Sequence, residues 1–290
     1  NAASMNNSGF EFSATYRNRD RDFKYELSAN LSTLRNRVTS LGFGTDSYIS
    51  GAYITNVGQE IGQFYGWAYE GIARTQEDLD NHATQEGAQI GDCLYKDISG
   101  PDGKPDGKVD ANDQVVLGSG MPKIHFGLNA RFEYKRFDLS IATFGALNYH
   151  VSDDIYNSLN SCYGWGNKEV GMLDANRFSE DGSTYLSNVP RTYVTNSASL
   201  GWNDLFSSRK IQNAAYWKIA NVELGYNFPN EWFGKYVSDV RFYVSAQNLH
   251  TFTGYHGYNV DYAGGTFTPG YNFCSYPTAR TFMCGVHFTF

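Results

Sequence analysis

The chain has 290 residues, of which 41% are hydrophobic and 16% aromatic, and its formal net charge is -7. The mean hydropathy is negative, at -0.47, and no apolar run approaches the roughly 18 residues of a membrane-spanning helix, so a helical membrane protein is excluded. The acidic balance, without any cluster of Lys and Arg, argues against nucleic acid as a partner.

The 22 Tyr and 20 Phe fit two classes of β protein. One is an outer-membrane barrel, in which lipid-facing residues are diluted by lumen residues and polar loops, and aromatic side chains collect in interfacial girdles. The other is a soluble β-sandwich or carbohydrate-binding domain, which is also rich in Tyr and Trp. Composition alone does not choose between them.

The first predicted elements are two strands joined by a short charged turn near residues 18–21. Apolar side chains alternate with polar ones in both, which predicts a hairpin with one apolar and one polar face. The apolar positions are Phe10, Phe12, Ala14 and Tyr16 in the first strand, and Phe23, Tyr25, Leu27, Ala29 and Leu31 in the second.

Two further strand candidates follow the hairpin. A weak one covers residues 46–56 and a stronger one covers 61–72, with residues 58–62 as the turn between them. A long irregular stretch then extends from about residue 75 to 120. Ordinary compact domains rarely contain loops longer than about 12 to 15 residues.

The rest of the chain repeats this organisation. Alternating strands are predicted at 122–134 and 137–148, joined by Lys135-Arg136, and at 216–228 and 240–253, joined across residues 229–238. Long loops cover about 149–212 and 253–278.

The last ten residues form a strand that ends on an aromatic side chain. Phe282, Cys284, Val286, Phe288 and Phe290 lie on one face, because successive side chains of a strand point to opposite faces. Soluble domains tend to end on polar, frayed residues. This terminal strand is typical of the closing strand of an outer-membrane β-barrel.

Loop length favours the barrel over the sandwich, since outer-membrane barrels pair short turns at one end with long loops at the other. If the terminal strand runs downward into the periplasm, the strands total about nine, whereas bacterial single-chain barrels have an even number. The first residues also lack the basic and apolar parts of a signal peptide. We therefore expect either a processed export signal or a piece of a longer barrel.

The loop between residues 97 and 113 is rich in oxygen ligands. Its spacing, with a central Gly107, approaches that of a calcium loop, although residues 101–105 form an insertion and Lys104 would occupy a ligand position in one register. We weigh a site for Ca²⁺ or a similar hard cation against a solvated acidic turn. The candidate ligands are Asp97, Ser99, Asp106, Asp110 and Asp113.

The four cysteines show no C-x-x-C spacing, so neither a zinc site nor a redox motif is indicated. Cys93, Cys162 and Cys274 fall in predicted loops. The sequence is compatible either with one disulfide among them or with three free thiols. Cys284 is expected to act as a small hydrophobic residue.

Aromatic side chains recur in the predicted loops. They could stack on sugar rings or contact a partner protein, or they could pack the loops onto one another. They are Tyr163, Trp165, Trp202, Tyr255, Tyr258, Tyr262 and Tyr271. The six His are scattered and no nucleophile motif is present, so an enzyme is not expected.

Several segments, in order over nearly the whole chain, resemble the SusC/RagA family of TonB-dependent outer-membrane transporters, specifically the C-terminal portion of the barrel. They are Gly9–Phe12, Gly62–Ile72, Lys96–Gly100 followed by Asp106–Asp113, Met121–Lys123, Tyr216–Tyr226 and Ser245–Phe252. The resemblance implies that residues 1–290 supply under half of a barrel of about 22 strands. The plug domain and the TonB-contacting segment would lie outside this chain.

The same resemblance implies energised import of an oligosaccharide or peptide across the outer membrane of a Gram-negative bacterium. The implied partners are TonB, bound through the missing N-terminal region, outer-membrane lipid and a SusD-like surface lipoprotein acting as a lid. It also makes Phe288 and Phe290 part of the C-terminal signal for barrel assembly. Two alternatives remain: a soluble β-sandwich that binds carbohydrate, and a passive pore or adhesin barrel.

Overall fold

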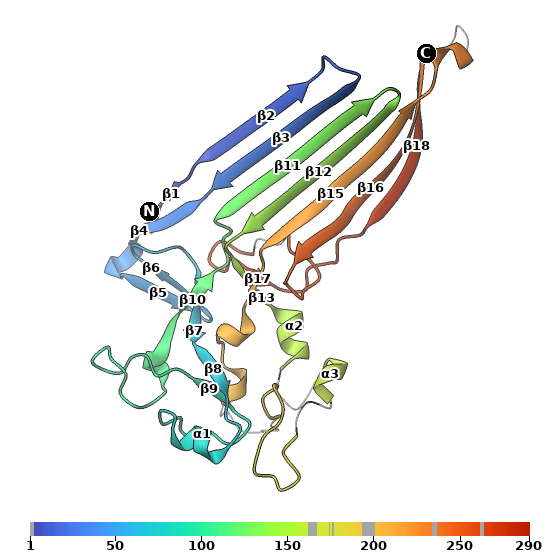
Figure 1. Ribbon diagram of the computed structural model, residues 1–290. Coiled ribbons are helices and arrows are strands. Elements are labelled where there is room, and N and C mark those ends of the chain that lie inside the picture. The colour runs from blue at the N-terminus through green and yellow to red at the C-terminus, as the bar shows by residue number, and fades with distance from the viewer. Residues whose placement is uncertain are drawn as a thin grey trace.

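The computed structural model describes residues 3–161, 167–173, 175, 177–192, 201–233, 237–261 and 264–290. A long antiparallel sheet makes up one half of the molecule, and the long loops gather in a separate lobe at one end of it (Figure 1). We call the described residues within 42–121, 148–213 and 254–280 the loop lobe.

The large sheet has seven strands in the order β18-β16-β15-β12-β11-β3-β2. Every neighbouring pair in it is antiparallel. The strands are β2 (Glu11–Asn18), β3 (Phe23–Thr33), β11 (Ile124–Tyr134), β12 (Phe137–Leu147), β15 (Tyr216–Asn227), β16 (Asp239–Thr253) and β18 (Thr281–Thr289).

The register of the sheet places the apolar residues in continuous rows, because directly paired residues point to the same face. One row crosses all seven strands and consists of Tyr16, Leu27, Ala130, Ile141, Val222, Ala246 and Phe282. The alternation that the sequence shows within each strand thus becomes a single apolar face of the whole sheet.

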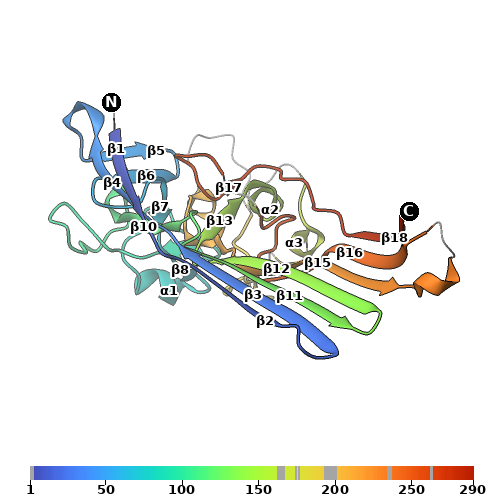
Figure 2. The ribbon, with the colours of Figure 1, turned by 90° about the horizontal axis from the view of Figure 1, so that it is seen from above.

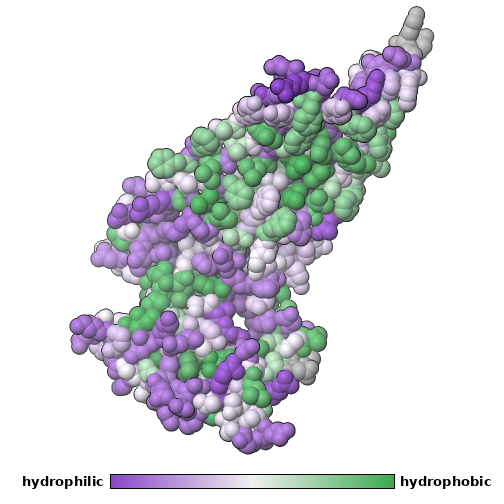
Figure 3. Space-filling model, viewed as in Figure 1, coloured by the Kyte–Doolittle hydropathy of each residue, from purple (hydrophilic) through white to green (hydrophobic). Residues whose placement is uncertain are grey.

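This apolar face is exposed. Tyr16 is 61% and Phe282 70% accessible, and the surface view shows apolar residues gathered over the sheet, with polar residues beyond both of its ends (Figure 3). A β-sandwich would bury such a face against a second sheet. The predicted fold class, an antiparallel segment of a larger β-barrel with long loops, is confirmed.

The two ends of the sheet differ as predicted. The turns at residues 19–22 and 135–136 and the described residues of the turn after β15 (228–233 and 237–238) lie at the end that holds the C-terminus, and the loop lobe lies at the other (Figure 1). We call the first the turn end. Beyond β2 and β3, the pair β1 (Ala3–Ser8) and β4 (Arg35–Leu41) continues the hairpin toward the lobe.

The prediction of two barrel strands between β3 and β11 was wrong. Residues 46–56 and 61–72 do not enter the large sheet, because β3 and β11 pair directly along their full lengths. Glycines with positive φ at 51, 58 and 62 divide this stretch into strands of four or five residues, too short for the roughly 9 to 11 of a membrane-crossing strand. The large sheet therefore has seven strands among the described residues rather than nine.

These short strands belong to the loop lobe, where β10, β7, β6 and β5 form one sheet and smaller sheets join the other strands. The strands are β5 (Ser47–Ser50), β6 (Tyr53–Asn56), β7 (Gln63–Trp67), β8 (Tyr69–Ile72), β9 (Cys93–Tyr95), β10 (Gln114–Ser119), β13 (His150–Asp153), β14 (Gln212–Asn213) and β17 (Tyr271–Asn272). The α-helices are α1 (Gln76–Asp80), α2 (Asp154–Leu159) and α3 (Val170–Leu173). The 3-10 helices are η1 (Gly42–Gly44), η2 (Ala111–Asp113), η3 (Trp202–Asp204), η4 (Ser208–Lys210) and η5 (Asn230–Trp232).

The buried core lies in the lobe and at its junction with the sheet. One cluster, Cys93, Tyr95 and Val109, packs with Trp67 and Trp202 inside the lobe. The second joins β12 and β15 to the loops and consists of Ala146, Tyr149, Val151, Ala214, Tyr216, Tyr255 and Val260. Seen from above, the lobe lies at the end of the large sheet opposite the turns (Figure 2). Within the described ranges, no helix is long and apolar enough to cross a membrane.

Candidate functional site

The face of the large sheet opposite the apolar one carries charged rows. Arg17, Glu26 and Arg131 are register partners on β2, β3 and β11, and the row continues through Ser140 to Glu223 on β15. Arg17 donates to both Glu26 carboxylate oxygens, at 2.7 and 3.2 Å. We call this surface the polar face; in a closed barrel it would line the lumen.

Three strands meet in an ion cluster near the turn end of this face. The Arg241 guanidinium donates to both carboxylate oxygens of Asp138, at 3.0 and 2.6 Å, and to Glu223 at 2.7 Å. Gly225 makes room for it, since a Cβ there would lie 2.4 Å from Arg241 Nη2. The cluster thus joins charged side chains from β12, β15 and β16.

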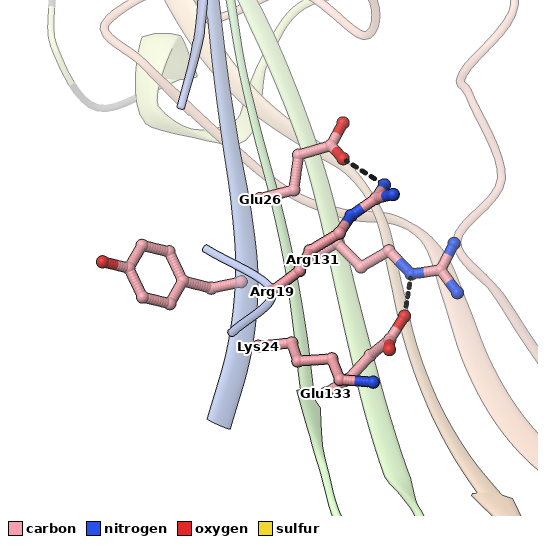
Figure 4. A pocket seen from close by; sticks show the side chains of 6 residues that line it. Arg19, Lys24, Glu26, Arg131 and Glu133 are labelled. Atoms are coloured by element: carbon pink, nitrogen blue, oxygen red, sulfur yellow. Dashed lines mark hydrogen bonds and ion pairs between the residues drawn. The ribbon is translucent and has the colours of Figure 1, made fainter. Parts of the chain in front are cut away.

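A second group of charges lines a hollow of about 380 Å³ on the same face (Figure 4). Arg19 contacts Glu26 at 3.7 Å and Arg131 contacts Glu133 at 3.1 Å. Lys24 extends beside Glu133 and makes no ion pair within the described part of the chain. The hollow is open and carries charged side chains of both signs.

Two of the predicted loop aromatics are packing residues. The Trp202 indole donates to Glu86 O at 2.8 Å, and its ring lies 6.3 Å from that of Tyr95 in the lobe core. Tyr255 is 6% accessible, and its hydroxyl hydrogen-bonds Asp153. The alternative that loops pack onto one another therefore holds for these two side chains.

Tyr258 and Tyr271 lie elsewhere in the lobe. Tyr258 is 60% accessible, and Tyr271 lines a cavity beside α2. Tyr163, Trp165 and Tyr262 lie outside the described residues. Ligand or partner contact by these five aromatics stays a prediction.

The acidic loop folds around its own carboxylates. Asp113 is fully buried and accepts from the backbone N–H groups of Ile98, Ser99 and Asp110, at 2.7 to 2.9 Å. Asp97 accepts from the backbone N–H groups of Asp106 and Gly107 in the same way.

Across the described ranges, no group of three or more His, Cys, Asp or Glu is placed to hold a metal ion. The hydrogen bonds support the acidic turn that we weighed against calcium, and metal binding by the loop stays a prediction.

Replacing Asp113 with alanine is expected to open this loop, because three partly buried N–H groups lose their charged acceptor, at a cost of about 3 kcal/mol. Protease cleavage between residues 97 and 113 of the full-length protein would measure it. The exposed Asp102, replaced in the same way, is the matched control and should change nothing. Protection of the wild-type loop by added Ca²⁺ would support the calcium hypothesis, and equal cleavage of both variants would contradict the hydrogen-bond explanation.

The cysteines sit in different surroundings. Cys93 is fully buried in the lobe core, whereas Cys274 is exposed and carries a free thiol. Cys162 lies outside the described residues, so a disulfide involving it stays a prediction. Cys284 lies in the apolar row of β18, as expected, and is also exposed.

The terminal aromatics lie at the turn end. Phe288 pairs with Val240 on the apolar face, and Phe290 is 88% accessible. Both positions leave the aromatic rings free for an assembly partner. Their part in barrel assembly stays a prediction.

Sequence reasoning missed two buried polar clusters. In the lobe, Arg191 donates to both Asp92 oxygens at 2.6 and 3.1 Å, and Asn203 donates to Asp92 at 2.7 Å. Where the lobe meets the sheet, Lys218 contacts Asp261 at 2.5 Å, although Lys218 is only 4% accessible. Each cluster joins residues too far apart in the chain for any local motif to reveal it.

His150 lies at the same junction, half-buried at the start of β13. Burial, helped by the nearby Lys123 ammonium, lowers its pKa below the usual 6.5. The neutral imidazole therefore favours the folded lobe above pH 6.5, and this stability is lost as the pH falls below it.

We expect protease cleavage of the lobe in the full-length protein to accelerate between pH 7.5 and 5, and to do so less in His150→Asn. Equal pH dependence of the two proteins would contradict this assignment.

No protein-family model matches the chain. It is 29% identical over 309 residues to TonB-dependent receptor P3 of Formosa agariphila and 25% identical over 297 residues to the TonB-dependent receptor SusC of Bacteroides thetaiotaomicron. The matches cover the whole chain but only 29% and 27% of these relatives. Among solved structures, the RagAB peptide transporter shares the fold, with a TM-score of 0.76 and 21% identity over 98% of this chain and 29% of that one.

The relatives are named as receptors and transporters, not enzymes. Their matches extend along the whole chain. Along its whole length the chain is thus similar to part of the TonB-dependent receptors, SusC among them.

Proposed function

We propose that residues 1–290 form the C-terminal part of the β-barrel of an outer-membrane TonB-dependent receptor in a Gram-negative bacterium. The exposed apolar face of the large sheet carries this proposal, since only lipid or a second layer covers such a face, and no second layer is present among the described residues. The outer edges of β2 and β18 would pair with the remaining barrel strands, which the chain does not contain.

The complete receptor would import a nutrient, an oligosaccharide or a peptide, and energy would reach it from TonB through a region outside this chain. The polar face supplies hydrated charges toward the lumen, where a plug would sit. A SusD-like lipoprotein would cover the loop lobe. The support is the names of the relatives, a SusC and a RagAB peptide transporter.

The two rival functions explain less. A soluble carbohydrate-binding sandwich would leave the row from Tyr16 to Phe282 facing water. A passive pore or adhesin would not account for full-chain likeness to receptors named for TonB dependence.

Deleting the gene for the whole receptor tests the proposal. Mutant cells, and cells depleted of TonB, should both fail to remove the same peptides or oligosaccharides from a defined mixture in the medium, as followed by mass spectrometry. A plasmid copy should restore removal. Uptake that continues without TonB would favour the passive pore, and a receptor found outside the outer-membrane fraction would overturn the proposal.

A further inference from the structure

Two arginines, Arg35 and Arg37 on β4, lie just beyond the apolar face of the large sheet, at its loop end. Within the seven strands that the structure describes in this sheet, the positions on the apolar face contain no Asp, Glu, Lys or Arg. The surface view shows the change, with polar residues over β1 and β4 directly after the apolar ones (Figure 3).

The register of the first hairpin decides on which side these arginines lie. The pairs Glu11–Ser32 and Ser8–Arg35 belong to one register, so β2 and β3 continue into β1 and β4 without a slip between them. Successive side chains of a strand point to opposite faces, and the odd-numbered residues of β3 form the apolar face. Arg35 and Arg37 therefore lie on the same side as that face.

The opposite side of β4 is packed against the lobe. Asn36 is buried and accepts the backbone N–H of Ile61 at 3.0 Å. Val38 is also buried, and its backbone N–H donates to Gln59 O at 2.9 Å. These contacts fix the backbone of β4 and direct the side chains of both arginines outward, where they are exposed.

Neither guanidinium has an internal partner. Among the residues that the structure describes, Arg35 and Arg37 form no ion pair, whereas Arg17, Arg131 and Arg241 on the polar face each contact a carboxylate. Alternate residues of a strand are about 7 Å apart, so the two guanidiniums can meet at one doubly charged group or at two neighbouring ones. Both positive charges are thus free for an external anion.

The place of the pair indicates the kind of anion. If the short turns lie in the periplasm, the loop end of the sheet faces the cell exterior. Residues directly beyond the apolar face are then at the depth of the lipid headgroups in the outer leaflet. Guanidinium groups bind phosphate through paired hydrogen bonds, and basic clusters beside a membrane-spanning segment bind anionic headgroups.

We infer that Arg35 and Arg37 bind the phosphate groups of an outer-leaflet lipid. Their register partners on β1, Asn6 and Ser8, are uncharged and offer further hydrogen bonds beside them. The inference rests on the proposed outer-membrane location and adds to it a lipid held at a defined place on the barrel wall.

The apolar residues next to the pair distinguish a lipid from a soluble anion. Phe10 and Phe12 follow Ser8 on the same side of the hairpin and are 84% and 63% accessible. The acyl chains of a lipid would cover these rings while its phosphates reach the arginines. A soluble phosphate would leave the rings uncovered and gain nothing from them.

Lipid binding to the delipidated, purified full-length receptor in detergent tests the inference, with native mass spectrometry as the readout. The probes are lipid A with two phosphates, the same lipid A with both phosphates removed, and inorganic pyrophosphate. The variants are Arg35→Gln, Arg37→Gln and the double substitution. Arg21→Gln is the matched control, because Arg21 is also exposed and unpaired within the described ranges but lies at the turn end of the same hairpin.

We expect each single variant to bind lipid A with two phosphates about tenfold more weakly, and the double variant more weakly still. Dephosphorylated lipid A should bind the wild type and the double variant equally weakly. Arg21→Gln should bind like the wild type. All variants should keep the fast migration of a folded barrel in unheated gels, which separates a loss of binding from a loss of folding.

Equal binding of lipid A with two phosphates by the wild type and the double variant would overturn the inference. So would equal binding of the two forms of lipid A by the wild type, or displacement of the lipid by an equal concentration of pyrophosphate. Unfolding of the double variant would assign the arginines a structural role instead. The import function stands through all of these results if TonB-dependent uptake is observed in cells, whereas a receptor outside the outer-membrane fraction would remove the proposed function itself.

Discussion

Alanine at Gly66 is expected to open the loop lobe. A Cβ at this position would lie 2.1 Å from the carbonyl oxygen of Phe206 and 3.0 Å from its carbonyl carbon. That carbonyl cannot turn aside, because it accepts the backbone N–H of Trp67 at 3.1 Å. Relieving the overlap must separate β7 from the segment after η3, at a cost of about 2–3 kcal/mol.

Gly71 provides the matched control, since it lies in the neighbouring strand β8 and no atom lies within 4 Å of the added Cβ. Protease cleavage of the lobe on intact cells would compare the two variants. Gly66→Ala should be cleaved faster, and Gly71→Ala should behave like the wild type. Identical behaviour of the two variants would show that the lobe tolerates a shift of Phe206.

Arg241→Met is expected to destabilise the barrel wall. The substitution keeps much of the side-chain bulk but leaves the carboxylates of Asp138 and Glu223 without the guanidinium that each now contacts. Removing one partner of a fully buried pair costs about 3–5 kcal/mol. The three side chains are 12% to 27% accessible, so solvent reduces the expected cost to about 2 kcal/mol.

The temperature at which the folded barrel loses its faster migration in unheated detergent gels would measure the effect. Adding Asp138→Asn and Glu223→Gln to the Arg241 variant should restore much of the loss, because the uncompensated negative charges are then gone. Arg131→Met removes a pair whose side chains are 64% and 41% accessible and should change the barrel by less than about 1 kcal/mol. An effect of Arg131→Met as large as that of Arg241→Met would contradict the role assigned to the cluster.

The strands of the large sheet could be predicted from sequence because their environment repeats every second residue. Residues 23–33 and 124–134 alternate without interruption, and the structure pairs them from Phe23 with Tyr134 to Thr33 with Ile124. Residues 46–72 show weaker alternation, and there the positive φ of Gly51, Gly58 and Gly62 turns the chain back on itself. A local pattern gives the type of an element but not the sheet that it joins.

The loop lobe was much harder to predict. Its ion pairs join residues such as Asp92 and Arg191, which lie 99 positions apart. Trp202, Tyr255 and Tyr258 are all aromatic residues of predicted loops. Trp202 and Tyr255 nevertheless pack inward, whereas Tyr258 is exposed. Which aromatic residues face a ligand depends on long-range packing, which one sequence does not encode locally.

The lobe core of Cys93, Tyr95 and Val109, with Trp67 and Trp202 around it, contains no residue of the large sheet. Its packing therefore does not depend directly on contacts with the strands of the large sheet. Substitutions in this part of the lobe are therefore expected to leave the large sheet undisturbed. Changes in the loops would then be limited mainly at the junction formed by Ala146 and Tyr216, where the lobe and the large sheet share one buried cluster.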